Sequence, residues 1–201
     1  MERVVVYIDG ANFYGGIFSI NPKYTDTKFD FERYINKIVG NRQLMFVKYY
    51  NASLKQQINP EIFKKQQRLF SRLRKIKNCE VILSKRKPRL DTEGKEYHTI
   101  KGDDINLALD MLEDAYENKY DTAILISSDG DFVSLVRKVK HKGKKIELHY
   151  FANCISNELL NEATYSKMID KKILKKFFYR ETDKKTKAKS NETKMRQQKR
   201  E

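Results

Sequence analysis

Short β-branched runs alternate with longer amphipathic segments along most of this chain, and this alternation constrains its fold more than any other feature. Residues 3–8 (RVVVYI) and 122–127 (TAILIS) have the composition of buried strands. Helical apolar spacing is found over residues 29–39 and 103–118. The alternation predicts an α/β fold, a three-layer α/β/α sandwich around a mainly parallel central sheet.

The remaining segments continue the same pattern. We expect further strands at residues 44–50, 80–84 and 145–151. We expect further helices, the first of them long and basic, at residues 60–77, 131–140, 157–163 and 171–179. A turn or hairpin is expected at residues 91–96.

The chain divides into one domain and a polar extension. Its 201 residues fit a domain over 1–170 followed by a basic helical extension and flexible tail over 171–201. Ala188 and Met195 are the only apolar residues after position 181, so the tail cannot bury enough surface to order itself. The tail either attracts phosphates or only keeps the protein in solution, and the sequence favours neither.

Two features bound the cellular setting. Cys79 and Cys154 are too few for a disulfide framework, which fits a reducing cytoplasm. The first apolar run, residues 4–8, is too short for a membrane span or a signal peptide. We therefore expect a cytoplasmic protein with no membrane partner.

The net charge of +15 is distributed unevenly. Residues 55–101 and 171–201 each carry nine more basic than acidic side chains, whereas residues 102–170 carry five more acidic ones. A basic excess favours a polyanionic partner such as nucleic acid. An acidic segment within a basic protein suits a metal-dependent enzyme acting on phosphodiesters, although ordinary surface charge explains the same counts.

Acidic residues stand where the predicted strands end. They are Asp9 with Asn12 nearby, Asp129 and Asp131 after Ser128, and Asp103 and Asp104 after Lys101-Gly102. Because the carboxyl ends of parallel strands share one edge, we expect these side chains to converge. Crowded carboxylates repel unless cations neutralise them, and Mg²⁺ or Mn²⁺ prefers such ligands. Whether one ion or two would bind remains open.

Helix capping is the alternative explanation for each of these acids. Any single aspartate in such a position is more often a cap, but capping does not require all three groups to share one edge. Helical phase favours Asp104 as a ligand turned inward and Asp103 as support. The same phase places an apolar stripe on Ile105, Ala108, Leu109, Leu112, Ala115 and Tyr116, and it places Asp110, Glu113, Asp114 and Glu117 on the solvated face.

Three segments resemble the motifs of the NYN domain, in its LabA-like branch, which belongs to the PIN-like nuclease superfamily. They are Val4–Asn12 (VVVYIDGAN), Lys101–Asp110 (KGDDINLALD) and Ile126–Phe132 (ISSDGDF). The resemblance covers about residues 1–170 and implies a PIN-like fold with a Mg²⁺- or Mn²⁺-dependent ribonuclease site.

The resemblance also assigns roles to residues. It places the metal site on Asp9, Asp104, Asp129 and Asp131, with Asn12 orienting the first aspartate or a metal-bound water. Many members read KGVD in the middle motif, so Asp103 is an additional acid here. An acid at position 110 fits the motif, so Asp110 is a second-tier candidate. Asp103 and Ser128 are the other second-tier candidates.

These observations together predict a metal-dependent RNA endonuclease. A metal-activated water would attack the phosphodiester in line, and Lys101 would stabilise the pentacoordinate phosphate. Basic side chains would hold the RNA backbone, namely Arg72, Lys75, Lys85, Arg86, Lys87 and Arg89.

The rival is a non-catalytic RNA-binding or regulatory protein with the same fold. A phosphatase is disfavoured because Asp9-Gly10-Ala11 lacks the Asp-x-Asp-x-Thr signature. A homodimer is compatible with the sequence but not indicated by it.

Overall fold

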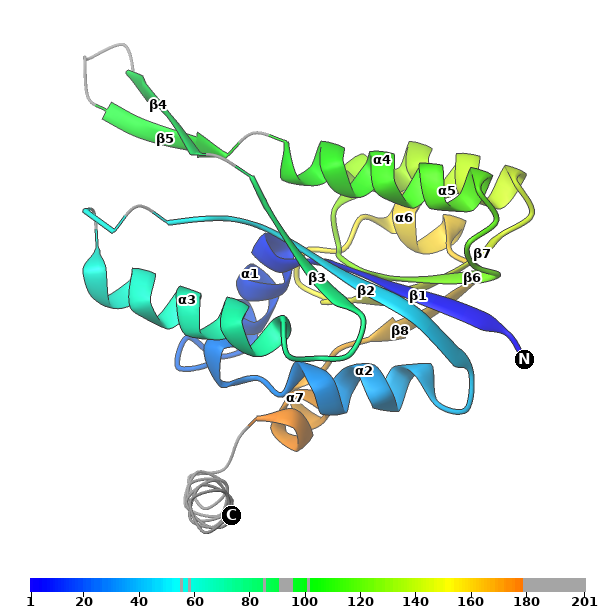
Figure 1. Ribbon diagram of the computed structural model, residues 1–201, viewed down its shortest axis with the longest axis horizontal. Helices are drawn as coiled ribbons and strands as arrows, with labels where there is room; N and C mark the ends of the chain where they lie inside the picture. Colours follow the sequence, from blue (N-terminus) through cyan, green and yellow to red (C-terminus); the bar gives the residue numbers. More distant parts are fainter. Residues whose placement is uncertain (55, 58, 85, 91–95, 101, 179–201) are drawn as a thin grey trace, which may run out of the picture.

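A six-stranded parallel sheet forms the centre of the protein (Figure 1). The computed structural model describes residues 1–54, 56–57, 59–84, 86–90, 96–100 and 102–178. The strands lie in the order β3-β2-β1-β6-β7-β8. Their bounds are β1 (Arg3–Asp9), β2 (Gln43–Ala52), β3 (Cys79–Ser84), β6 (Thr122–Ile126), β7 (Lys145–Tyr150) and β8 (Tyr165–Met168).

Helices cover both faces of this sheet (Figure 1). One layer contains α1 (Gly10–Ile20), α2 (Phe31–Val39), α3 (Pro60–Leu73), α7 (Lys171–Phe177) and the 3₁₀ turn η1 (Asp26–Lys28). The other contains α4 (Asp103–Tyr116), α5 (Val133–His141), α6 (Asn157–Glu162) and the 3₁₀ turn η2 (Gly130–Phe132). The predicted three-layer α/β/α sandwich is confirmed.

The alternation of side chains along β1 links the two hydrophobic layers. Val4, Val6 and Ile8 pack into the α1–α2–α3 layer, whereas Val5 and Tyr7 pack into the α4–α5 layer. Both faces are buried, which is why the strand reads as an unbroken apolar run. Since side chains two residues apart share a face, the next residue, Asp9, falls on the α4 side.

The sheet has its topological switch point at β1. The chain leaves β1 to build β2 and β3 on one side, and β6 later pairs with the other side, where Ile8 lies opposite Ile126. Ligands of open parallel sheets bind beyond the carboxyl ends of the strands at such a point. Asp9 and the segment Ser127–Asp129 therefore emerge side by side at this position, which we call the carboxyl edge.

An edge strand and a hairpin add to the elements that the sequence predicts. The edge strand β8 was not predicted, because its four residues are all exposed and show no apolar alternation. An antiparallel hairpin of β4 (Arg86–Leu90) and β5 (Glu96–Ile100) extends away from the sheet between β3 and α4 (Figure 1). The predicted turn lies largely outside the described residues, as does the predicted flexible tail. No helix in the described part of the chain has the length and apolar content to span a membrane.

The predicted phase of α4 is wrong. Its buried apolar residues are Leu107 and Met111, which the predicted stripe lacked, and Ala115, which it included, whereas Ile105 and Leu109 are exposed. The sequence offers two apolar stripes, one through Leu107 and Met111 and one through Ile105 and Leu109, and periodicity alone does not distinguish them. Packing selects the first stripe, and this rotation reverses the predicted burial of the two aspartates that begin the helix.

Candidate active site at the carboxyl edge of the sheet

Asp9 is the most buried of the acidic residues at this edge. It ends β1, caps α1, and is only 5% exposed. Its Oδ1 accepts a hydrogen bond from the backbone N of Asn12 at 2.9 Å, and its Oδ2 accepts one from Ser127 Oγ at 3.0 Å. Burial raises the pKa of Asp9 to about 6; the charges of Asp104 and Asp103 add to this and the two hydrogen bonds oppose it. Asp9 therefore acts as a helix cap and as part of an acidic cluster.

The loop after β6 is tied to the start of α1 by hydrogen bonds. Asn12 Oδ1 accepts from the backbone N of Ser128 at 2.9 Å, and Ser127 Oγ accepts from the backbone N of Asp129 at 3.2 Å. Asp129 Oδ1 in turn accepts from the backbone N of Asp131 at 3.0 Å. The two strand ends therefore hold their aspartates in a fixed relation.

Ser128, a second-tier candidate, and Ser127, which was not among the candidates, both form hydrogen bonds that hold the loops of this edge. Ser128 is fully buried, and its Oγ accepts a hydrogen bond from the backbone N of Phe151 at 2.9 Å. This second-tier candidate thus anchors the loop after β7. Sequence analysis missed Ser127, which bonds to both Asp9 and the Asp129 backbone. Its place at the end of a buried strand was the only signal for it.

The N-terminus of α4 supplies two further carboxylates. Gly102 turns the chain into the helix with φ of 97°, a left-handed conformation that favours glycine. Asp103 is buried, with only 8% of its surface exposed, whereas Asp104 is exposed. This is contrary to the prediction that Asp104 turns inward. The pKa of Asp104 is raised to about 6. Desolvation of its carboxyl is the largest cause, and the charges of Asp103, Asp129 and Asp131 add to it. Asp104 is therefore electrostatically coupled to the β6 loop.

The predicted acids at this edge influence one another electrostatically, and among the described residues no cation compensates them. Within the described part of the chain, none of them forms an ion pair; they are Asp9, Asp103, Asp104, Asp129 and Asp131. Lys101, the basic residue expected beside them, lies outside the described residues. The mutual repulsion of these carboxylates is the feature that a bound cation would relieve.

A closed metal cage is not assembled at this edge. Among the residues that the structure describes, no group of three or more His, Cys, Asp or Glu side chains is placed to hold a metal ion. Mg²⁺ is nevertheless commonly bound through one or two carboxylates, with water and substrate phosphates completing its shell. The all-oxygen donors therefore fit a hard divalent ion that binds together with a phosphate-bearing substrate.

Asp110, the other second-tier acid, belongs to a separate network. The Tyr50 hydroxyl donates a hydrogen bond to Asp110 Oδ2 at 2.7 Å, and Lys48 Nζ lies 3.5 Å from the same oxygen. Lys48 also donates to Asp114 at 2.8 Å. Asp110 is thus held by partners from β2, and its charge is compensated within the fold.

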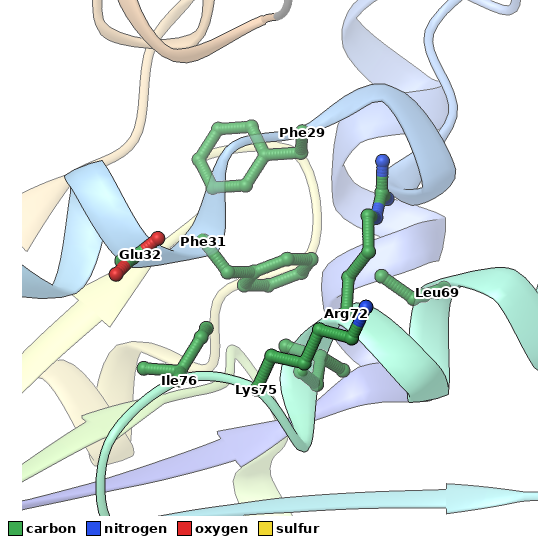
Figure 2. Close-up of a pocket in the computed structure, with 8 residues that line it drawn as sticks. Phe29, Phe31, Glu32, Leu69, Arg72, Lys75 and Ile76 are labelled. Atoms are coloured by element: carbon green, nitrogen blue, oxygen red, sulfur yellow. The ribbon is translucent and has the colours of Figure 1, made fainter. Parts of the chain in front are cut away.

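The predicted phosphate-binding residues are placed in different ways. Arg72 lines a cavity of about 150 Å³ between α2 and α3, beside Phe29 and Phe31 (Figure 2). Its Nη2 donates to the carbonyl oxygen of Thr27 at 2.5 Å, so it joins α3 to η1.

The other basic candidates lie after α3 and on the hairpin. Lys75 is exposed just after α3. Arg86, Lys87 and Arg89 lie on β4 of the hairpin that follows β3. Lys85 lies outside the described residues. The hairpin therefore carries basic residues on the connection from the end of β3 to the start of α4.

The parallel sandwich with an acidic switch point defines a PIN-like α/β domain. Residues 3–170 match the NYN domain, and the chain belongs to the NYN domain family. This is a PIN-like nuclease family whose members are generally ribonucleases, which supports an enzyme of the nuclease type. The predicted family is confirmed, whereas the LabA-like branch stays a prediction.

Solved structures support the fold. A Vibrio parahaemolyticus protein of unknown function superposes with a TM-score of 0.67 at 24% identity, covering 89% of this chain and 96% of that chain. A Parabacteroides merdae protein described as a candidate oxidoreductase has a TM-score of 0.32 at 11% identity, covering 80% of this chain and 27% of that chain, and carries no argument. No curated protein matches the sequence.

Proposed function

We propose that this protein is a metal-dependent RNA endonuclease whose active site is the carboxyl edge. The observation that carries the proposal is Asp9, a buried carboxylate at the switch point that feels the charges of Asp103 and Asp104 and has no basic partner among the described residues. A fold keeps such a costly arrangement where function requires it. Membership of a nuclease family supplies the reaction class.

Each residue of the edge has a role in this proposal. Asp9, Asp104 and Asp129 would hold Mg²⁺ or Mn²⁺, and Asp131 would do so directly or through water. The bound ion would supply a water of lowered pKa and would neutralise phosphate charge. Asn12 and Ser127 fix the loops and the Asp9 carboxylate, so the acid is oriented before substrate binds. Such preorganisation lowers the cost of reaching the reactive geometry.

The basic residues would hold the RNA backbone beside this edge. Arg86, Lys87 and Arg89 lie on the hairpin, and Lys75 is exposed after α3. Lys85 and Lys101 flank the hairpin in sequence. Lysine and arginine contacts to phosphates fix the position of a strand without selecting its sequence. We therefore expect broad sequence tolerance, with binding that weakens as the salt concentration rises.

A non-catalytic RNA-binding protein is the second candidate. The lack of a closed metal cage among the described carboxylates favours it. The two functions differ in one respect that is easy to measure, since only the enzyme changes the length of its RNA.

The test is a cleavage assay with end-labelled single-stranded and structured RNAs in Mg²⁺, Mn²⁺ or EDTA. Wild-type protein is compared with Asp9→Asn, Asp129→Asn and Glu113→Gln, which removes an exposed carboxylate from the outer part of α4. We expect metal-dependent internal cleavage that falls by at least about 100-fold in both asparagine variants. Glu113→Gln should cleave like wild type.

Two results would count against the enzyme. Cleavage that continues in EDTA or in both asparagine variants would place the activity elsewhere. Intact RNA under all conditions, with binding retained, would favour the binding protein.

A further inference from the structure

Helix α1 presents two aromatic side chains to solvent. Tyr14 is 44% exposed and Phe18 is 45% exposed. Being four residues apart, they share one face of the helix, and their rings stack with centroids 6.1 Å apart and planes at 28°. By contrast, Tyr49 and Tyr50 of β2 are buried in the core. Nothing in the described fold accounts for an exposed ring pair on α1.

A glycine beside these rings, on the exposed side of α1, has no packing explanation among the described residues. Gly15 is exposed in the middle of α1, and a Cβ added there would meet no atom within 4 Å. In contrast, a Cβ at Gly16 would overlap the Phe151 ring, and one at Gly10 would come within 2.5 Å of Tyr49. Glycine destabilises a helix interior relative to alanine. Packing thus accounts for Gly10 and Gly16, whereas Gly15 leaves bare backbone open to a ligand.

The ring pair stands on the helix that begins at the acidic edge. Helix α1 begins directly after Asp9, and Asn12 of its first turn holds the β6 loop. Tyr14 lies five residues beyond Asp9, which corresponds to about 7.5 Å along the helix axis. A nucleic-acid strand with one phosphate at the edge would therefore bring neighbouring bases to this face. The positive end of the helix dipole also points to the edge.

We propose that Tyr14 and Phe18, with Gly15 between them, form a stacking platform for the bases of single-stranded RNA entering the active site. This proposal rests on the proposed ribonuclease function. Aromatic rings stack on any base, so the platform would bind strands without strong sequence preference. Bases in a duplex are stacked on one another, so the platform selects unpaired RNA.

The size and chemistry of the face favour RNA over a protein partner. A stable protein interface buries about 800 Å² on each side, far more than two half-exposed side chains provide. The helix itself carries no charged residue, which leaves the face apolar. The chain as a whole has a net charge of +15, which favours a polyanion over a neutral peptide.

The test measures binding in EDTA and cleavage in Mn²⁺ for wild type and four variants. Single-stranded RNA containing 2-aminopurine and its duplex serve as probes. The variants are Tyr14→Ala, Phe18→Ala, Gly15→Ala and the control Tyr116→Ala, which removes an exposed ring from the far end of α4. We expect wild type to quench 2-aminopurine in the single strand, which reports stacking.

The expected changes are specific to the platform. Tyr14→Ala and Phe18→Ala should each weaken single-strand binding about tenfold and raise KM while leaving kcat nearly unchanged. Gly15→Ala should raise the Tm and yet weaken binding, a combination that loss of folding cannot produce. Tyr116→Ala should bind like wild type.

Three results would overturn the platform. Unchanged affinity, KM and quenching in Tyr14→Ala and Phe18→Ala, with wild type still cleaving RNA, would reject it and leave the ribonuclease intact. Equal losses for single strand and duplex would show that the rings do not act by stacking. A wild-type protein that neither binds nor cleaves RNA would reject both proposals.

Discussion

The two ends of helix α4 carry carboxylates in opposite circumstances. At its N-terminus, Asp103 and Asp104 are electrostatically coupled to Asp9, and desolvation and mutual repulsion raise the pKa of Asp9 and of Asp104 to about 6. Near its C-terminus, Asp114 is 1% exposed and accepts hydrogen bonds from Tyr7, Lys48 and Lys119 at 2.7–2.8 Å. Burial would raise the pKa of Asp114, but these donors outweigh it and lower the pKa.

The difference separates acids whose charge the fold compensates from acids whose charge it does not. Asp114 has two cations and a hydroxyl supplied by the fold, so its charge is neutralised where it stands. The acids of the carboxyl edge have no such partner among the described residues, so the fold holds them at a cost. A helix with the same residue type at both ends thus stabilises the sandwich at one end and leaves charge for an external cation at the other.

Removing the compensated acid should have the largest effect on stability. Asp114→Ala leaves Lys48 and the Tyr7 hydroxyl without their acceptor beneath α4, and we expect a loss of about 3 kcal/mol in the free energy of unfolding. Urea denaturation followed by circular dichroism measures this. Glu117→Ala removes the exposed partner of the same Lys119 and should cost at most about 0.5 kcal/mol. Equal effects of the two variants would show that Asp114 is not a structural anchor.

Removing an uncompensated acid should do the reverse, and the effect should depend on pH. The pKa of Asp9 is about 6 in the folded protein and 3.8 ordinarily, so folding favours its protonated form. Its carboxyl therefore costs no stability below about pH 4, and the cost grows as the pH rises through 6, to roughly 2–3 kcal/mol. Asn keeps the helix cap, so Asp9→Asn without metal should match wild type near pH 4 and be more stable at pH 7.

The control for this prediction is Asp121→Asn. Hydrogen bonds from Arg3 lower the pKa of Asp121 to about 2, so its contribution is present above pH 4 and lost as the pH falls through 2. Asp121→Asn should therefore be less stable than wild type at pH 7. Between pH 4 and 7 this deficit should stay constant, whereas Asp9→Asn should gain stability relative to wild type, and thermal unfolding of both variants over this range measures the difference. Parallel curves for Asp9→Asn and wild type would contradict the account of the carboxyl edge.

The sequence predicts the acidic edge better than it predicts the compensated network. Asp9 and Asp129 follow strands that are unbroken apolar runs, so their convergence follows from parallel topology alone. Asp114 was expected on the solvated face, yet it is buried. The prediction failed because its partners Tyr7 and Lys48 lie 107 and 66 residues away in sequence. No local pattern reveals pairing over such separations.

The phase of α4 and the strand β8 escaped prediction for related reasons. Two overlapping apolar stripes allow α4 either rotation, and only packing against the sheet selects one. Likewise, β8 is exposed on every residue and exists because β7 offers it hydrogen-bonding groups. Ser127 joins Asp9 to the β6 loop through a hydroxyl that no spacing rule singles out.

Divalent-metal binding tests the central claim that the carboxyl edge needs a cation from outside the fold. Isothermal titration of Mn²⁺ into wild type, Asp9→Asn and Glu113→Gln at pH 7, with thermal unfolding alongside, makes the comparison. The account predicts that wild type binds Mn²⁺ and gains roughly 1–2 kcal/mol of stability at ten times the Kd. Asp9→Asn should bind at least about tenfold more weakly, and Glu113→Gln should match wild type. Equal Mn²⁺ affinity in wild type and Asp9→Asn would contradict it.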